Sequence, residues 1–394
     1  MHTMDVSDAN SQQVEARVVA GLPKVVLHDH IVGGIRPETL IELAEAQNYD
    51  DLPYTNPDEL AAWFVKRCDS HCDKNRAEVE KHLLALTQTT DAIIRITREA
   101  VLDLARDNVV YAELRISPER HLRKGLTLQD VADAIAEGLR DGEDAAEYEG
   151  KTITARGIIC ARRDENRSEE IARLVVDNVP ENSDHPYLVA FGLEGPEQGN
   201  PIENHKEAFD LLRRKLAPST VDAGQTGGVD SIRKAIIVGC NRIGHGFRIY
   251  EDFTATLDGI DLQFLSGYVR DQRIPLELCP TSNVQTGAVD DIADHPFPLL
   301  DDLGFTCTVN TDNRLLTGTT MTDEMMVLVD NFGYGFTDLF QLVANALENA
   351  FVDLPTREQI LDTQVYPEFL RLTDRDNDGE VDVDEEVESV LDGG

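Results

Sequence analysis

The hydrophobic pattern of this chain alternates between short apolar runs and longer stretches in which apolar residues recur at helical spacing. The short runs are typical of strands buried on both faces, and the stretches at 127–139, 168–176, 204–216 and 229–237 are typical of amphipathic helices. Regular alternation of the two predicts a parallel sheet, and eight such units closing on themselves predict a (β/α)8 barrel. The eight expected strands are 24–28, 109–115, 153–160, 188–193, 219–223, 242–246, 274–279 and 305–310.

Helical spacing also fills residues 58–106, between the first two expected strands. We expect a helical insertion there, which could cover the mouth of the barrel, although ordinary core packing would produce the same spacing. The expected division of the chain is a polar N-terminal tail at 1–15, a barrel at 16–372 and an acidic tail at 373–394.

Net charge and composition limit which classes of binding partner this chain can have. The 394 residues include 74 acidic and 36 basic residues, giving a net charge of −38, which disfavours nucleic acid and anionic membranes as partners. No window approaches the ~20 continuous apolar residues of a membrane span, and the N-terminus has no hydrophobic signal region, so we expect a cytoplasmic protein. The six cysteines are spread along the chain, which favours reduced thiols over a disulfide framework.

Candidate chemistry lies at the ends of the expected strands. His28 and His30 are two residues apart on a strand, so both imidazoles can point at one place in space, as metal ligands do. An isolated pair of this kind could equally be two polar residues at a strand-to-loop junction. Asp222, His245 and Asp312 also end short apolar runs, however, and the carboxyl ends of barrel strands form one active face. We therefore expect these five residues to form a single site.

Five motifs, in this combination and order, resemble the adenosine deaminases of the metal-dependent amidohydrolase barrels, in particular their bacterial branch. The resemblance runs from about Gly21 to Leu372. The motifs are LPKVVLHDH at 22–30, YAELRISP at 111–118, RIGHG at 242–246, CPTS at 279–282 and VNTDN at 309–313.

The resemblance implies a zinc ion that lowers the pKa of a bound water, which attacks C6 of the purine of a nucleoside and releases ammonia, so that adenosine becomes inosine. Carried over by position, His28 and His30 are zinc ligands, and Asp312 is a ligand that also contacts the attacking water. His245 would orient or deprotonate that water. Gly195 would lie against the purine through its backbone.

The chain departs from the family pattern on strand five. The family motif there is His-Ala-Gly-Glu, whose histidine binds zinc and whose glutamate donates a proton to N1 of the purine, whereas this chain has Asp222-Ala-Gly-Gln225. Asp222 can still be a fourth ligand, but its charge makes a bound water less acidic. Gln225 stands in the proton-donor position and can hydrogen-bond N1 but cannot deliver a proton, a step worth ~10²–10⁴ in rate. Further departures are Val32 near the ribose, Asp164, Gly192, and Asn313 in place of an aspartate that faces the purine.

Four hypotheses remain open from the sequence. The chain could be an active adenosine deaminase, an aminohydrolase of altered specificity, a catalytically inactive protein that binds purine nucleosides, or a structural barrel. The histidines and aspartates at strand ends argue against the last. We favour a zinc aminohydrolase of the adenosine deaminase type whose activity is weak or lost because of Asp222 and Gln225.

The acidic tail carries the spacing of an EF-hand loop. Gly379 stands where the loop turns sharply, and Val381 supplies the apolar eighth position. An acidic tail that matches by chance is the alternative interpretation. The expected calcium ligands are the side chains of Asp374, Asp376, Asp378, Asp382 and Glu385, with the backbone carbonyl of Glu380.

Overall fold

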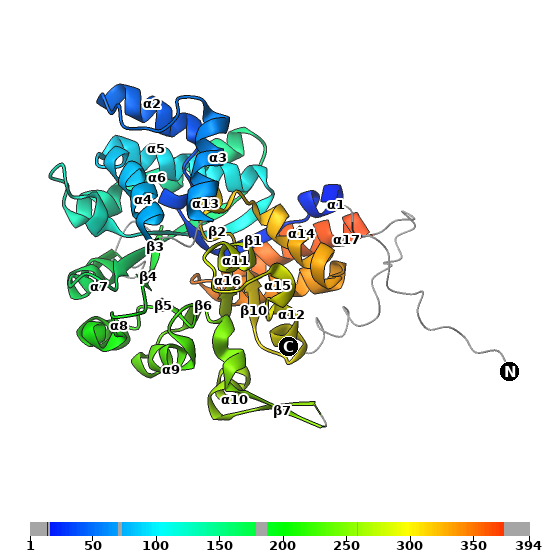
Figure 1. Cartoon of the computed structure of the whole chain (residues 1–394). Coiled ribbons are helices and arrows are strands. Elements are labelled where there is room, and N and C mark those ends of the chain that lie inside the picture. Colours follow the sequence, from blue (N-terminus) through cyan, green and yellow to red (C-terminus); the bar gives the residue numbers. More distant parts are fainter. Residues whose placement is uncertain (1–13, 15, 70–72, 179–186, 258, 374–394) are drawn as a thin grey trace.

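Eight parallel strands form a barrel surrounded by helices in the computed structural model (Figure 1). The structure describes residues 14, 16–69, 73–178, 187–257 and 259–373. The expected (β/α)8 barrel is confirmed, and its strands pair in chain order. They are β1 (Lys24–His30), β2 (Val109–Ile116), β3 (Thr154–Arg162), β4 (Leu188–Glu194), β5 (Ser219–Ala223), β6 (Arg242–His245), β9 (Leu276–Leu278) and β10 (Cys307–Val309).

The barrel closes where β1 meets the end of β10. A single bridge joins Asp29 to Asp312, with the backbone N–H of His30 donating to the Asp312 carbonyl at 2.7 Å. Nearer the start of the strands, the side-chain Oδ1 of Asn310 accepts the N–H groups of Leu27 and His28 at 2.9 and 3.1 Å. An amide side chain therefore replaces part of the backbone ladder, and we call this junction the seam.

Four α-helices of the described residues lie between β1 and β2 (Figure 1), and the last three of them cover the stretch at 58–106 where the sequence predicts a helical insertion. The helix α5 begins after Thr89, whose side chain accepts the Ala92 N–H as an N-cap. The next α-helix, α6 (Leu128–Tyr148), lies so close to α5 that a Cβ added at Gly138 would sit 2.6 Å from Thr97 Cβ. The four helices are α2 (Pro37–Gln47), α3 (Pro57–Cys68), α4 (Asp73–Leu86) and α5 (Thr90–Arg106).

A two-stranded hairpin, β7 (Phe253–Thr256) and β8 (Gly259–Leu262), follows β6 and projects away from the barrel at the lower edge of Figure 1. The hairpin is not among the strands expected from the sequence. The remaining helices are α1 (Ala16–Gly21), α6 (Leu128–Tyr148), α7 (Ser168–Asn178), α8 (Lys206–Lys215), α9 (Gly228–Val238), α10 (Phe264–Asp271), α11 (Pro280–Gln285), α12 (Phe297–Asp302), α13 (Arg314–Thr317), α14 (Met321–Phe332), α15 (Phe336–Glu348), α16 (Leu354–Ile360) and α17 (Tyr366–Thr373).

Some expectations fall on parts of the chain that the structure does not describe. The EF-hand-like loop lies in residues 374–394, and the N-terminal tail lies in residues 1–15, of which only residue 14 is described. Within the described ranges, the helices are all too short or too polar to cross a membrane. The five cysteines that the structure describes are free thiols.

Candidate active site

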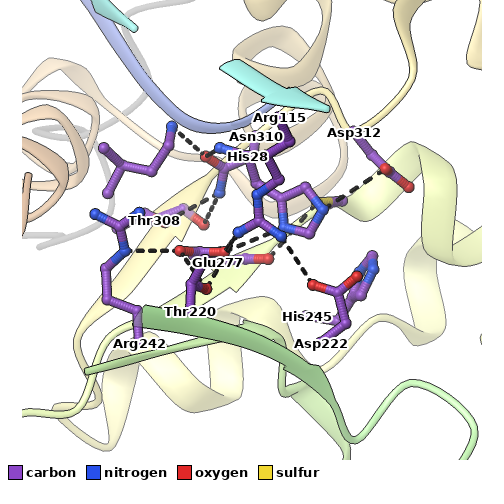
Figure 2. Close-up of polar contacts among 12 residues, drawn as sticks. His28, Arg115, Thr220, Asp222, Arg242, His245, Glu277, Thr308, Asn310 and Asp312 are labelled. Atoms are coloured by element: carbon purple, nitrogen blue, oxygen red, sulfur yellow. Dashed lines mark hydrogen bonds and ion pairs between the residues drawn. The ribbon is translucent and has the colours of Figure 1, made fainter. Parts of the chain in front are cut away.

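The carboxyl ends of the strands bring the five predicted residues together. His28 and His30 end β1, Asp222 lies near the end of β5, His245 ends β6, and Asp312 follows β10. Potential ligand atoms of His28, His30 and Asp312 lie within 4.8 Å of one another, as do those of His28, Asp222 and His245. Figure 2 shows four of these side chains converging.

Two of these residues have a backbone conformation that is costly for residues other than glycine. The φ angles are +60° at His245 and +59° at Asp312. Left-handed backbone at non-glycine residues is uncommon and clusters at functional sites, where the surrounding structure enforces it. For Asp312 that enforcement is visible at the seam, because its N–H donates to the His28 carbonyl at 2.9 Å.

A buried carboxylate faces Nδ1 of each histidine of β1, but only the His28 pair is a hydrogen bond, because Glu194 Oε2 has no hydrogen-bond partner among the described residues. His28 Nδ1 lies 3.2 Å from Glu277 Oε2, and His30 Nδ1 lies 3.3 Å from Glu194 Oε2. An ionised carboxylate only accepts hydrogen bonds, so it favours the proton on Nδ1 and leaves a lone pair on Nε2. Pairs of this kind are typical of histidines that bind metals.

The two Nε2 atoms face the same oxygen. Oδ1 of Asp312 lies 3.7 Å from Nε2 of His28 and 3.4 Å from Nε2 of His30. Burial alone would raise the pKa of Asp312, but the adjacent His28 and His30 outweigh it and lower that pKa to about 2. His28 Nε2 is buried and has no hydrogen-bond partner among the described residues. Two imidazole nitrogens and a carboxylate oxygen match the ligands that zinc prefers, so this set fits a metal ion.

Glu277 is the centre of a buried polar network (Figure 2). Besides its contact with His28, it accepts hydrogen bonds from Arg115, from Arg242 Nε at 2.7 Å and from Thr220 Oγ1 at 3.0 Å. Burial raises the pKa of Glu277, but Arg115 and Arg242 overcome this effect and hold the pKa well below its ordinary value. The carboxylate is therefore charged at the floor of the site.

Asp222 is shared between the site and this network. Arg115 Nη1 donates to Asp222 Oδ1 at 2.8 Å, and both side chains are buried. Burial raises the pKa of Asp222, but His28 and Arg115 lower it further than burial raises it. A Cβ at position 244 would lie 2.1 Å from Asp222 Oδ1, so Gly244 provides the room for the carboxylate. Asp222 thus has the charge of a ligand, but one of its oxygens is engaged by a guanidinium.

The turn after β5 is held by Glu197. Its carboxylate accepts the backbone N–H groups of Gly224, Gln225 and Thr226 at 2.7–2.9 Å. Gln225 is half-buried, two residues beyond the end of β5. This anchoring gives the proton-donor position a fixed backbone.

The two predicted substrate contacts flank the metal-ligand candidates. Gly195 follows β4 with φ of +102°, and a Cβ there would meet Arg162 at 3.2 Å and Asp164 at 3.3 Å. Asn313 follows Asp312 and donates from Nδ2 to Asp312 Oδ1 at 2.5 Å. Gly195 directly follows Glu194, whose carboxylate faces His30, and Asn313 contacts the candidate ligand Asp312.

His245 is linked to two residues that the sequence analysis did not assign. Asn283 Nδ2 lies 3.1 Å from His245 Nδ1, and Asn283 Oδ1 lies 3.1 Å from His295 Nε2. Burial, and then the neighbouring His28, lower the pKa of His245 below its ordinary value, which favours the neutral ring.

The other residues missed from the sequence are Arg115, Glu194 and Glu277. Each is a charged residue inside or at the end of a strand whose residues are all buried. A charged residue within a continuous apolar run is therefore the sequence signal that points to them. A buried charge requires a partner, and buried partners cluster at sites.

Comparisons with known proteins agree with the motifs. The family model described as adenosine deaminase matches residues 23–366. The adenosine deaminase of Mycobacterium sp. (strain JLS) is 44% identical over 353 residues, covering 89% of this chain and 96% of the relative. That of Mycolicibacterium gilvum is 45% identical over 349 residues, covering 88% and 95%.

Two solved structures also align with this fold over most of its length. An adenine deaminase from Arthrobacter aurescens aligns with a TM-score of 0.73 at 25% identity, covering 89% of this chain and 98% of the other. An amidohydrolase from Burkholderia ambifaria with bound Zn aligns with a TM-score of 0.76 at 25% identity, covering 93% and 97%.

Proposed function

Because the chain belongs to the adenosine deaminase family, whose members are hydrolases acting on C–N bonds, we propose that it is a zinc aminohydrolase that converts adenosine and water into inosine and ammonia. The observation that carries the proposal is the convergence of His28 Nε2 and His30 Nε2 on Asp312 Oδ1, with a buried carboxylate facing each Nδ1 atom.

In this proposal His28, His30 and Asp312 hold the zinc ion, and Asp222 is a weaker fourth partner. The ion supplies Lewis-acid chemistry, lowering the pKa of water so that a nucleophile is present at neutral pH. Arg115 weakens the fourth position because its guanidinium competes with a cation for Asp222 Oδ1.

The other residues position the substrate. His245 lies beside His28, with ring centroids 5.0 Å apart, and orients the attacking water. Gln225 hydrogen-bonds N1 of the purine from the turn that Glu197 anchors. Gly195 contacts the purine with its backbone, and Asn313 takes the position that faces the purine in the family.

We propose that turnover of adenosine is slow, and that Gln225 limits it more than Asp222 does. A carboxylate in place of an imidazole still offers an electron pair to zinc, whereas an amide has no proton to give to N1. Without that proton the ring accepts electrons at C6 poorly, and the general-acid contribution of ~10²–10⁴ is lost.

A second candidate is an aminohydrolase of altered specificity. It is favoured by Val32, which stands where the family has a carboxylate near the ribose, and by the likeness to an adenine deaminase. A third, an inactive protein that binds purine nucleosides, would explain the same departures without a reaction.

The test is a set of turnover assays on zinc-loaded protein, following purine absorbance with adenosine and, separately, with adenine. We expect Gln225→Glu to raise kcat/KM for adenosine more than Asp222→His does, and the double variant to exceed both, because a proton donor acts together with an activated water. Gln272→Glu, an exposed change at the end of α10, is the matched control and should change nothing.

The outcomes separate the candidates. Faster turnover of adenine than of adenosine would favour the second candidate, and binding of adenosine without product in any variant would favour the third. Natural protein that turns adenosine over at ordinary rates, with kcat of about 10 s⁻¹, would refute the proposed defect at Gln225.

A further inference from the structure

A chain of three buried side chains leads from the backbone of α12 to the candidate site. Phe297 N–H donates to His295 Nδ1 at 3.1 Å, His295 Nε2 lies 3.1 Å from Asn283 Oδ1, and Asn283 Nδ2 lies 3.1 Å from His245 Nδ1. Asn283, His295 and His245 are 0, 2 and 3% exposed, so water cannot substitute for these contacts.

The hydrogen bond from Phe297 to His295 determines which atoms donate in the other two hydrogen bonds. A backbone N–H only donates, so His295 Nδ1 has to carry a lone pair, and the proton of the neutral ring is on Nε2. Burial, and then the neighbouring His245, lower the pKa of His295 to about 3, which agrees with a neutral ring. His295 therefore donates from Nε2 to the oxygen of Asn283.

The proton on His295 Nε2 determines how the Asn283 amide is oriented. With its oxygen turned toward His295, its NH2 group faces His245 Nδ1, which has to accept. The backbone of Asn283 cannot easily turn the amide away, because its N–H donates to the Cys279 carbonyl at 2.9 Å and its carbonyl accepts from Ala288 at 3.0 Å. Reversing the direction of these hydrogen bonds would require a proton on His295 Nδ1, and that proton would then face the Phe297 N–H.

We infer that Asn283 and His295 fix His245 in the tautomer that carries its proton on Nε2, so that His245 presents an N–H donor to the site. A potential ligand atom of His245 lies within 4.8 Å of those of His28 and Asp222, and Nδ1 is already bonded to Asn283. The ring donates a hydrogen bond to an oxygen in the site and holds it in place, and does not take a proton from it in the resting state.

Asn283 and His295 are positioning residues, because they act through His245. The part that His245 plays in turnover rests on the proposed function, but the position of its proton does not. The structure also assigns the opposite tautomer to His28, whose Nδ1 faces the Glu277 carboxylate. Neighbouring imidazoles, 5.0 Å apart, thus present a lone pair and a donor to the same site.

The experiment is NMR of the full chain labelled with ¹⁵N-histidine, in which one-bond and two-bond ¹H–¹⁵N correlations distinguish the two neutral tautomers. Two buried histidines serve as internal references. His121 has its proton on Nδ1, which lies 2.7 Å from the Thr87 carbonyl, and His205 has its proton on Nε2, which lies 3.2 Å from the Arg163 carbonyl. The His245 signals are assigned by their loss in His245→Gln.

We expect His245 to give the pattern of His205 in the natural chain. Asn283→Asp replaces the NH2 group with an oxygen of similar size that only accepts, so His245 should switch to the pattern of His121. Asn241→Asp is the matched control, because Asn241 Oδ1 accepts the Ser219 N–H and an aspartate preserves that bond. Its spectrum should match the natural one at His245.

A natural chain whose His245 follows His121, or an Asn283→Asp variant whose His245 is unchanged, would overturn the inference. If Asn283→Asp does not fold, His295→Phe replaces it: Asn283 then loses its fixed direction, and His245 should show both tautomers. A single unchanged tautomer in that variant would refute the part assigned to His295. Absence of adenosine turnover, with the expected spectra, would remove the proposed function and leave this inference standing.

Discussion

Replacing Glu277 with glutamine removes one charge from the floor of the site and keeps the size of the side chain. Each carboxylate oxygen accepts two hydrogen bonds: Oε1 from Thr220 and Arg242, and Oε2 from His28 and Arg115. An amide has a single oxygen, so its NH2 group has to face two of these donors. Either orientation leaves one guanidinium without its bond to residue 277.

The size of the effect follows from these contacts. Two hydrogen bonds that involve a charged group are lost, each worth about 1.5–3 kcal/mol, so we expect the free energy of unfolding to fall by about 3–6 kcal/mol. Removing one partner from a buried ion pair costs about 3–5 kcal/mol, which is the same range. Because Glu277 also holds Nδ1 of His28, zinc affinity should fall about 10–100-fold.

The assays are urea unfolding at pH 6 and competition with a chelator for zinc. Glu324→Gln is the matched control: Glu324 is also fully buried, but burial raises its pKa to about 7, so it is largely protonated at pH 6 and resembles an amide. Because Glu324 ionises near 4.5 in the unfolded chain, we expect the control at pH 6 to be no less stable than the natural chain, and by linkage up to about 2 kcal/mol more stable. A Glu277→Gln variant as stable as this control, with an unchanged denaturant slope, would refute the reasoning.

Three other predictions concern metals and pH. The double variant His28→Ala, His30→Ala should purify without zinc whereas the natural chain contains it, as measured by elemental analysis; equal, near-zero zinc in both would contradict the ligand assignment. Glu324 has a pKa of about 7 in the folded chain but ionises near 4.5 when unfolded, so the free energy of unfolding should fall as pH rises from about 4.5 to 7. In urea titrations at pH 5 and pH 8, Glu324→Gln should reduce that fall by up to about 3 kcal/mol. Parallel pH profiles for the two proteins would contradict this prediction. Calorimetry with calcium should give a heat that vanishes when the segment from Thr373 onward is removed, and identical traces would mean that the tail is merely charged.

The strands were predictable because a buried parallel strand is a short continuous apolar run. The fifth strand was predicted with its observed bounds, Ser219–Ala223. The last two were predicted too long, at 274–279 and 305–310, where only Leu276–Leu278 and Cys307–Val309 pair. Apolar residues continue past the paired segment, and hydrophobicity does not mark where pairing stops.

The candidate ligands were predictable for a similar local reason, since the spacing of His28 and His30 fixes their common direction. Their supporting partners were not. Arg115 and Glu277 are 162 residues apart and meet across the barrel interior, so which charges pair depends on closure and not on periodicity. The hairpin, by contrast, has a local signal in the sequence, because the Asp-Gly pair at 258–259 is a common hairpin-turn dipeptide within an alternating stretch.

The seam sets a limit on when this protein can acquire its site during synthesis. Asn310 pairs with backbone 283 residues earlier in the chain, and the candidate ligands come from both sides of that junction. At about 5–20 residues per second, a ribosome needs roughly 15–60 s to travel from one side to the other. Until then one edge of β1 is unpaired, and His28 and His30 lack the third ligand, Asp312. A nascent or truncated chain that ends before β10 therefore cannot assemble this ligand set, however well its first strands and helices have folded.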